Sequence, residues 1–331
     1  MKKILAKSMG VLLLAMLCVT GAVKAKAATW NETVSHKTTK GAFTFHAYLS
    51  ENGKESWIYK VDVNAKKGST KTLKFPAKVK GAKVTKLGYP EKVADYNVFD
   101  KKENYSEPRK SIFDTWVKAI YSMDGYLPGL EKIKALILPD SVKDITLGAF
   151  SGMRSLKKVK LPDNLTKIKG SVFYGCKKLQ KVTLPKKLKK FSPFAFMDCG
   201  SLKSVTISKK NKSFYMKKGM LLSKNKKTFY WVAPYKSKVK IPGAVKRIHD
   251  AAFWFSEATE IRIPKSVTKI SKNALYGNWV QDIIIDKKNK AFFRKNDCVY
   301  DRKTEKVIWQ YDDDPFSEDM YVGCVEWLYK S

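Results

Sequence analysis

The sequence lacks the residue sets on which most enzymes and metalloproteins depend. Its 331 residues include only three His and five Cys, and no two Cys have the Cys-x-x-Cys spacing of common metal and redox sites. It contains neither a Gly-x-Ser-x-Gly nucleophile elbow nor a phosphate-binding P-loop pattern. These absences argue against a metal, a cofactor and a hydrolytic triad, and they favour a protein that is not an enzyme.

Acidic residues and arginine are also scarce. Only 30 Asp and Glu stand against 66 Lys and Arg, so the formal net charge is +36, and only six of the basic residues are Arg. Proteins that read nucleic-acid bases rely on Arg, because its planar guanidinium makes bidentate contacts. Charge carried by Lys indicates diffuse attraction to a polyanion, or simply a solvated surface. We therefore expect nucleic acid to bind only as a non-specific polyanion.

The chain lacks an apolar run long enough to span a membrane. Three lysines precede an apolar segment from Met9 to Val19, and Ala25-Lys26-Ala27 supplies a small-x-small cleavage site. Because a spanning helix needs about 20 apolar residues, this pattern predicts a secretory signal peptide over residues 1–27, with an uncleaved anchor as the alternative. We expect a secreted, extracellular protein, either free or held at the cell surface without a covalent link.

What the chain does contain is a repeat. Leu138, Leu161, Leu184 and Ile207 fall at a fixed period of 23 residues. A period in the twenties is typical of a solenoid whose turns stack and share one core. Alternation in each unit predicts a short strand with one inward residue. In successive coils this residue is Val159, Val182, Val205, Ile261 and Ile283. We expect these strands to form a parallel sheet on the inner face.

Each unit continues past this strand in the same way. Pro162 ends the strand, and a second short extended piece follows from Leu165 to Ile168. A helical turn on the far side of the coil then carries a small or branched residue beside a large apolar one, and stacking the coils should place these large side chains over one another as a spine. The pairs are Ala149-Phe150, Val172-Phe173, Ala195-Phe196, Ala252-Phe253 and Ala274-Leu275.

At these residues the chain resembles the BspA-like leucine-rich repeats of bacterial surface proteins. The match is clearest in LKKVKLPDNLTKIKGSVFYGC, it recurs from about residue 130 to 286, and a weaker match runs from Leu73 to Gly88. The resemblance implies an α/β solenoid and a secreted or cell-surface protein that binds macromolecules, in adhesion or in contact with matrix or cell wall. Its partner would be a host or cell-wall protein or an anionic polymer. Such folds serve many partners, so the resemblance specifies fold better than function.

The remaining segments are predicted as additions to the solenoid. Residues 28–68 are interpreted as a β-rich amino-terminal cap, and residues 69–129 as a degenerate first coil with a helical excursion. Residues 130–331 hold the repeats, with two β-hairpins expected to project from them at 208–240 and 286–321.

The hairpins are expected because two stretches are alike. Ile207 to Trp231 and Ile285 to Trp309 align without a gap at an offset of 78 residues. Both contain Lys-Lys-Asn-Lys, an aromatic pair and two strand-like pieces around a polar turn.

The excursion supports an alternative hypothesis, a hydrolase with its site at residues 89–129. This segment carries Asp95, Asp100, Glu103 and Glu107 beside several aromatic residues. Paired carboxylates act as acid and base only when they are held at a fixed separation, which a sequence does not show. We therefore prefer the non-catalytic interpretation, with no catalytic, cofactor or metal residue assigned.

Two cysteines occupy one repeat position. Cys176 and Cys199 align with Met153, which indicates a core site and predicts buried free thiols. Stacked coils would also bring their Cα atoms within disulfide range, so a disulfide is the alternative. The same alternatives hold for Cys298 and Cys324.

A row of basic residues is the candidate binding site. The second extended piece of each coil exposes one residue before its inward one, and if the hairpins leave the stack unbroken these residues lie about 4.8 Å apart. Two like charges at about 5 Å repel by roughly 0.8 kcal/mol even in water. Lys160 and Lys181 are expected to flank the row and add to the repulsion. The row holds Asp144, Lys167, Lys190, Arg247 and Lys269.

An anionic polymer lying along this row would relieve the repulsion and release counterions. A teichoic acid, a sulfated glycan or DNA would each suit it. The alternative is a solvated basic edge whose long side chains splay apart.

Overall fold

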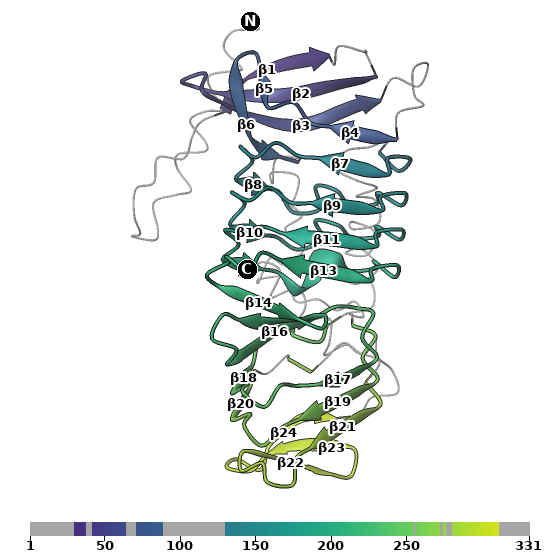
Figure 1. The fold of residues 1–331 in the computed structure, drawn as a ribbon, viewed down its shortest axis with the longest axis vertical. Helices are drawn as coiled ribbons and strands as arrows, with labels where there is room; N and C mark the ends of the chain where they lie inside the picture. The colour runs from purple at the N-terminus through teal and green to yellow at the C-terminus, as the bar shows by residue number, and fades with distance from the viewer. Residues whose placement is uncertain are drawn as a thin grey trace, which may run out of the picture.

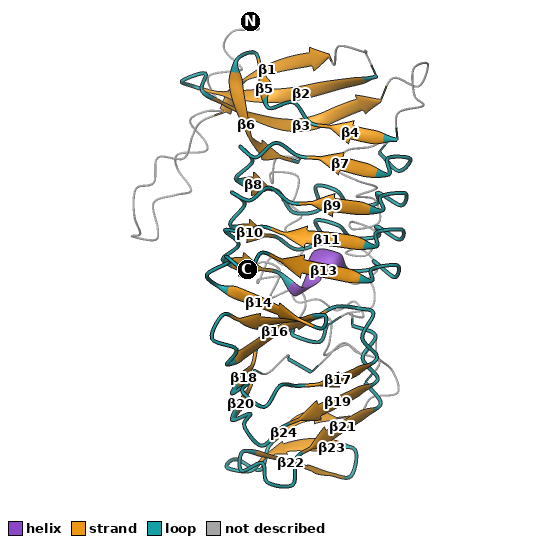
Figure 2. Cartoon of the chain, in the orientation of Figure 1, coloured by secondary structure: helices purple, strands orange, loops and turns teal. Residues whose placement is uncertain are grey.

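The protein is an elongated stack of coils with a β-sheet at its amino-terminal end (Figure 1). The structure, a computed structural model, describes residues 30–37, 42–63, 71–88, 130–254, 256–271, 274–275 and 280–310. The expected signal peptide, the excursion at 89–129 with its carboxylates, and Cys324 lie outside these residues. Strands dominate the described part of the chain (Figure 2), and the predicted leucine-rich solenoid with a parallel sheet is confirmed.

The amino-terminal sheet runs in the order β1-β2-β3-β6-β5. Phe43, Phe45 and Ala47 alternate with half-buried residues, which gives β2 one buried face. A turn precedes β3, with Gly53 at φ +64° and its N–H donating to the carbonyl oxygen of Ser50 at 2.8 Å. Strand β3 pairs in parallel with β6, so the sheet covers the edge of the first coil. The strands are β1 (Trp30–Lys37), β2 (Phe43–Ser50), β3 (Glu55–Val63), β5 (Lys78–Val79) and β6 (Ala82–Leu87).

A parallel five-stranded sheet, which we call the first sheet, holds the first strand of each coil. The register places Val159, Val182 and Val205 side by side, and all three are buried as predicted. Leu73 joins this row through the pairing of β4 with β7, so the degenerate first coil is part of the stack. The strands are β4 (Thr72–Lys74), β7 (Ala135–Ile137), β9 (Lys158–Lys160), β11 (Lys181–Leu184) and β13 (Ser204–Ile207).

The second extended pieces form shorter parallel pairs beside the first sheet. Strand β6 pairs with β8, and β10 pairs with β12. In the carboxy-terminal half, β17-β19-β21 repeats the arrangement of the first sheet, and Ile261 and Ile283 are buried there as predicted. The strands are β8 (Asp144–Ile145), β10 (Lys167–Ile168), β12 (Lys190–Phe191), β17 (Lys238–Lys240), β18 (Arg247–Ile248), β19 (Glu260–Ile263), β20 (Lys269–Ile270) and β21 (Asp282–Ile285).

The two predicted hairpins differ from expectation in their strand number, and the first also differs in its placement. Each is a three-stranded antiparallel meander, because the aromatic pair forms a strand of its own. The first meander does not project freely, since β16 pairs in parallel with β18 and so occupies a place in the stack. Backbone groups at the edge of β18 need a partner, and β16 supplies it. The strands are β14 (Phe214–Lys217), β15 (Met220–Ser223), β16 (Thr228–Val232), β22 (Phe292–Lys295), β23 (Cys298–Asp301) and β24 (Val307–Gln310).

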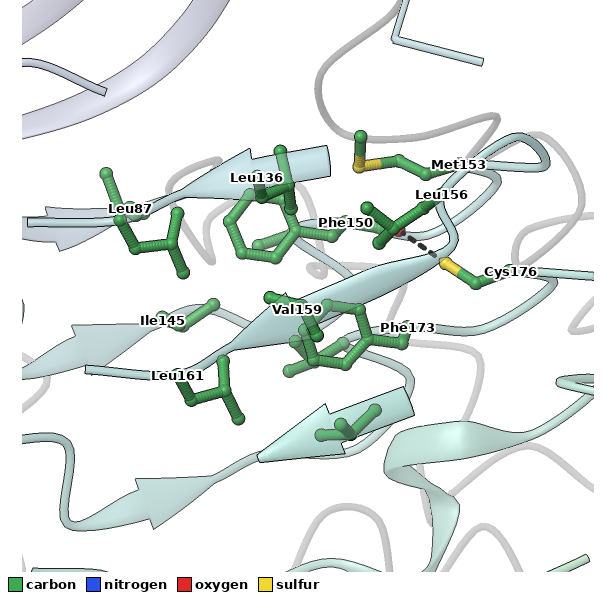
Figure 3. Close-up of a cluster of buried hydrophobic side chains, with 14 of the residues drawn as sticks. Leu87, Leu136, Ile145, Phe150, Met153, Leu156, Val159, Leu161, Phe173 and Cys176 are labelled. Carbon is green, nitrogen blue, oxygen red and sulfur yellow. Dashed lines mark hydrogen bonds between the residues drawn. The ribbon is translucent and has the colours of Figure 1, made fainter. Parts of the chain in front are cut away.

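The predicted aromatic spine runs through the core. The ring of Phe173 stacks on that of Phe150, with 5.7 Å between centroids (Figure 3). On its other side it stacks on Phe196, with 5.5 Å between centroids. Phe75 continues the spine at one end, 6.0 Å from Phe150, and Trp231 at the other, 5.9 Å from Phe196. The helical turn expected on the far side of each coil is found in one coil only, as the 3-10 helix η3 (Pro193–Phe196), the one helix among the described residues. The matching segments of the neighbouring coils are non-helical turns.

The cysteine position is a core site, as predicted. Cys176 and Cys199 are buried free thiols, so the disulfide alternative does not apply in this structure. The Cys176 Sγ–H donates to the carbonyl oxygen of Phe150 at 3.2 Å, shown dashed in Figure 3, and the Cys199 Sγ–H donates to Phe173 at 3.1 Å. Burial raises the pKa of both thiols well above the ordinary value. Cys298 is a half-buried free thiol.

Two buried asparagines attach the meanders to the preceding coils. The Asn211 Nδ2 donates to the carbonyl oxygens of Lys186 at 2.9 Å and Leu188 at 3.0 Å, and its Oδ1 accepts from the N–H of Phe214 at 2.6 Å. Asn289 plays the same part for the second meander: its Nδ2 donates to the carbonyl oxygens of Pro264 and Val267, and its Oδ1 accepts from the N–H of Phe292. The Asn of Lys-Lys-Asn-Lys therefore replaces backbone pairing where the coil pattern stops.

Candidate polyanion-binding surface

The structure divides the predicted basic row into two pairs. Lys167 lies beside Lys190 in the β10–β12 register, and Arg247 lies beside Lys269 in the β18–β20 register. The other neighbour of Arg247 is Thr228 of β16, because the first meander lies between the pairs. The unbroken row expected from the sequence is therefore wrong.

The acid that begins this row is already engaged. The Asp144 carboxylate lies 3.5 Å from Lys86 Nζ and 3.4 Å from Lys169 Nζ. Its negative charge is shared between two neighbouring coils and offsets part of the basic charge at this edge.

Lys160 and Lys181 do not flank the row. Both lie on the first sheet, where Lys181 is in register with Lys158 and Lys160 is in register with Thr183. They belong to another surface, which the sequence analysis did not identify.

This second surface carries eight exposed lysines in three columns along the first sheet. One column holds the residue that precedes each strand, the second holds the first residue of each strand, and the third holds the third residue. None of these positions is acidic in any of the five strands. We call this surface the lysine face. Its members are Lys71, Lys74, Lys134, Lys157, Lys158, Lys160, Lys181 and Lys203.

Backbone pairing holds the first column of the lysine face in register. The Lys134 N–H donates to the carbonyl oxygen of Lys71 at 2.7 Å, and the Lys157 N–H donates to that of Lys134 at 2.9 Å. Gln180 and Lys203 continue the column with bonds of 2.8 and 3.0 Å. In Figure 1 the strands β7, β9, β11 and β13 lie one below another, so the columns follow the long axis of the molecule.

The lysines of this face repel one another. The ammonium of Lys71 is the largest cause that holds the pKa of Lys134 below its ordinary value, and Lys157 and Lys178 act in the same direction. Within the described part of the chain, none of the eight lysines forms an ion pair with a carboxylate. No described carboxylate thus compensates the positive charge of the face.

The equivalent surface of the carboxy-terminal half is neutralised. Strands β17, β19 and β21 place Lys238, Glu260 and Asp282 in one column. The Glu260 carboxylate lies 2.7 Å from the Arg262 Nε and 3.9 Å from the Lys238 Nζ, and Asp282 bonds to Arg294. The hydrogen bond from Arg262 is the main cause that lowers the pKa of Glu260. Among the described residues, the same positions therefore carry ion pairs in the carboxy-terminal half and lysines without a carboxylate partner on the first sheet.

A shallow hollow between the amino-terminal sheet and the first coils is a weaker candidate. Lys54, Lys83 and Lys143 are among the residues that line it, with Glu55. The Glu55 carboxylate accepts hydrogen bonds from Lys143 Nζ at 2.9 Å and from Thr85 Oγ1 at 3.2 Å, so its charge is already satisfied. Across the described ranges, no cluster of three or more His, Cys, Asp or Glu side chains could hold a metal ion.

The pattern of the lysine face was present in the sequence. The residues that precede the five strands of the first sheet are four Lys and one Gln. The second strands drew attention away from it, because basic residues fill nearly every repeat there as well.

A family model described as a BspA type leucine rich repeat region matches six copies over residues 128–220 and 222–303. The chain belongs to this family. This BspA-type repeat protein has no match among curated proteins. In the described residues, none of its helices is long and apolar enough to cross a membrane.

Several solved structures are similar to this BspA-type protein at a distance. A leucine rich cell surface protein from Faecalibacterium prausnitzii A2-165 is 16% identical with a TM-score of 0.35, and the match covers 76% of each chain. A leucine-rich repeat protein from Eubacterium ventriosum ATCC 27560 is 15% identical with a TM-score of 0.37, covering 77% of this chain and 72% of that one. A leucine rich repeat protein from T. pallidum is 17% identical with a TM-score of 0.34, covering 75% and 86%.

Proposed function

We propose that this protein is a secreted or cell-surface repeat protein that acts by binding an anionic macromolecule, without catalysis. The observation that carries the proposal is the lysine face, whose eight exposed lysines have no carboxylate partner among the described residues. Membership of the BspA-type family and the leader-like residues 1–27 support a role outside the cell.

The physical reason is the cost of leaving these charges together. Neighbouring strands lie about 4.8 Å apart, and two ammonium groups at that distance repel by roughly 0.8 kcal/mol in water. A bound polyanion removes the repulsion and releases its own counterions to solution. The same lysines would gain little from a neutral ligand.

The hydrolase alternative has no supporting observation. Its carboxylates at 89–129 lie outside the described residues, so this alternative stays a prediction.

The proposal is tested by measuring affinity for anionic and neutral polymers at several salt concentrations. We expect the mature chain to bind poly(glycerol phosphate) or heparin and to ignore dextran. If about four phosphates are neutralised, the affinity should fall about 50-fold between 50 and 200 mM salt. Equal affinity for the neutral polymer, or binding that does not respond to salt, would contradict the proposal.

A further inference from the structure

We propose that the lysine face is the binding site and that its ligand is a linear, ring-free phosphodiester polymer, a chain of alditol phosphates, lying along the stack of coils. This rests on the proposed function and makes it specific, because it names one face and one chemical class. Two observations favour this face over the other basic surfaces, and two more favour a flexible polyanion as its ligand.

The first reason is charge compensation. The row at the second strands includes Asp144, which is paired with Lys86 and Lys169, and the carboxy-terminal sheet pairs Lys238 and Arg262 with Glu260. A polyanion gains less where it must compete with a carboxylate already in place. The lysine face has no such competitor among the described residues.

The second reason is direction. The columns of the lysine face follow the strand order β4-β7-β9-β11-β13. Four spacings of about 4.8 Å make a strip about 19 Å long, which favours an extended chain over a compact ligand. The chain axis would run parallel to the long axis of the molecule in Figure 1.

The third reason is the residue type. All cations of the face are Lys, which binds phosphate as a point charge with rotatable donors, whereas Arg adds planar bidentate recognition. Lysine is depleted at protein–protein interfaces, and the face carries one well-exposed apolar side chain, Ile137 at 49%. A folded protein partner would therefore find little apolar surface to bury.

The fourth reason excludes more rigid polyanions. Duplex DNA is read by an element that enters a groove, and here the lysines lie on the outer side of a sheet. Single-stranded nucleic acid and sugar rings gain from stacking on aromatic side chains, and none of the face positions in these five strands is aromatic. A ring-free alditol phosphate needs no stacking partner, and it can adjust its charge spacing to that of the coils.

Three variants of the full mature chain test the location. Each removes four positive charges, and Gln keeps most of the aliphatic stem, so circular dichroism should match the parent and no variant should unfold at a markedly lower temperature. The face variant carries Lys134→Gln, Lys157→Gln, Lys158→Gln and Lys181→Gln. The row variant carries Lys167→Gln, Lys190→Gln, Arg247→Gln and Lys269→Gln. The meander variant carries Lys217→Gln, Lys218→Gln, Lys226→Gln and Lys227→Gln.

The probe is lipid-free poly(glycerol phosphate), with heparin and DNA at the same concentration of charge. Loss of four phosphate contacts should weaken binding by the face variant about 100-fold at 100 mM salt. The row and meander variants should stay within about three-fold of the parent, and the parent should prefer poly(glycerol phosphate) to heparin and DNA.

The other outcomes overturn separate parts of the argument. Equal losses of affinity in all three variants, or the largest loss in the row variant, would show that the lysine face is not the binding site, while polyanion binding itself would stand. Tighter binding of heparin or DNA than of poly(glycerol phosphate) would contradict the assignment of an alditol phosphate as the ligand. Failure of the parent to bind any of the three polymers at low salt would overturn the proposed function itself.

Discussion

Lys134 and Lys157 occupy equivalent positions in neighbouring coils, and the N–H of Lys157 donates to the carbonyl oxygen of Lys134 at 2.9 Å. Both side chains are exposed, and a third lysine, Lys71, lies on the other side of Lys134. The backbone bonds that build the solenoid thus hold like charges together. Folding places them there because the inward apolar residues, and not the lysines, set the register.

Lys134 should lose its proton at a lower pH than an ordinary lysine. Repulsion from Lys71 lowers its pKa in the folded state, so the unfolded chain binds the proton more tightly. Stability should therefore rise with pH as Lys134 deprotonates, and this contribution is complete once the ordinary lysine pKa is passed. Side-chain NMR titration of labelled lysine at low salt measures the pKa directly. Lys71→Gln should raise the pKa of Lys134, and so should a bound polyanion. An unchanged pKa in both experiments would contradict the repulsion between these lysines.

Truncating the centre of the aromatic spine should be costly. Phe173 is fully buried between Phe150 and Phe196, so Phe173→Ala should lower the free energy of unfolding by about 3–5 kcal/mol. Urea denaturation measures the loss. Phe293→Ala is the matched control, because Phe293 is only half-buried against Tyr300 and should cost about 1 kcal/mol. A loss below 1 kcal/mol at Phe173 would mean that the spine does not carry the core.

Removing the asparagine that joins the first meander to the stack should also destabilise the protein. Asn211→Ala leaves buried carbonyl and N–H groups of Leu188 and Phe214 without their side-chain partner, which should cost about 3 kcal/mol. Asn225→Ala is the control, because Asn225 lies in an exposed turn where its Oδ1 accepts from the Lys227 N–H at 3.0 Å. Its cost should stay near 1 kcal/mol. Equal costs would show that the buried bonds contribute no more than an exposed turn does.

The two core thiols should resist modification. Burial raises the pKa of Cys176 and Cys199 and so suppresses the reactive thiolate. Iodoacetamide at pH 8 followed by peptide mass spectrometry should label Cys298, which is half-buried, well before either core cysteine. All of them should react in denaturant. Rapid labelling of Cys176 in the native protein would show that the coils open locally.

The structure confirms the strand positions, the parallel register and the aromatic spine that the sequence predicted. These features follow from local rules, because an inward residue such as Val159 recurs in every coil and a terminating residue such as Pro162 recurs in most of them. The meanders were foreseen as hairpins from their shared pattern, but the extra strand at Phe214 was not. An aromatic pair beside a Lys-rich turn does not reveal whether it forms a strand or packs as a loop.

The candidate site was harder to predict, because neighbours across coils decide which lysines stay unpaired. Lys238 and Lys158 hold equivalent positions, yet only Lys238 faces a glutamate in the next coil, at 3.9 Å. The sequence alone determined the strands and turns of each coil, because they follow from the inward apolar residues within a single repeat. Only the tertiary structure decided which charged columns continue along the molecule. Strand β16 pairs with β18 and divides one row, while uninterrupted pairing from β4 to β13 keeps the lysine face whole.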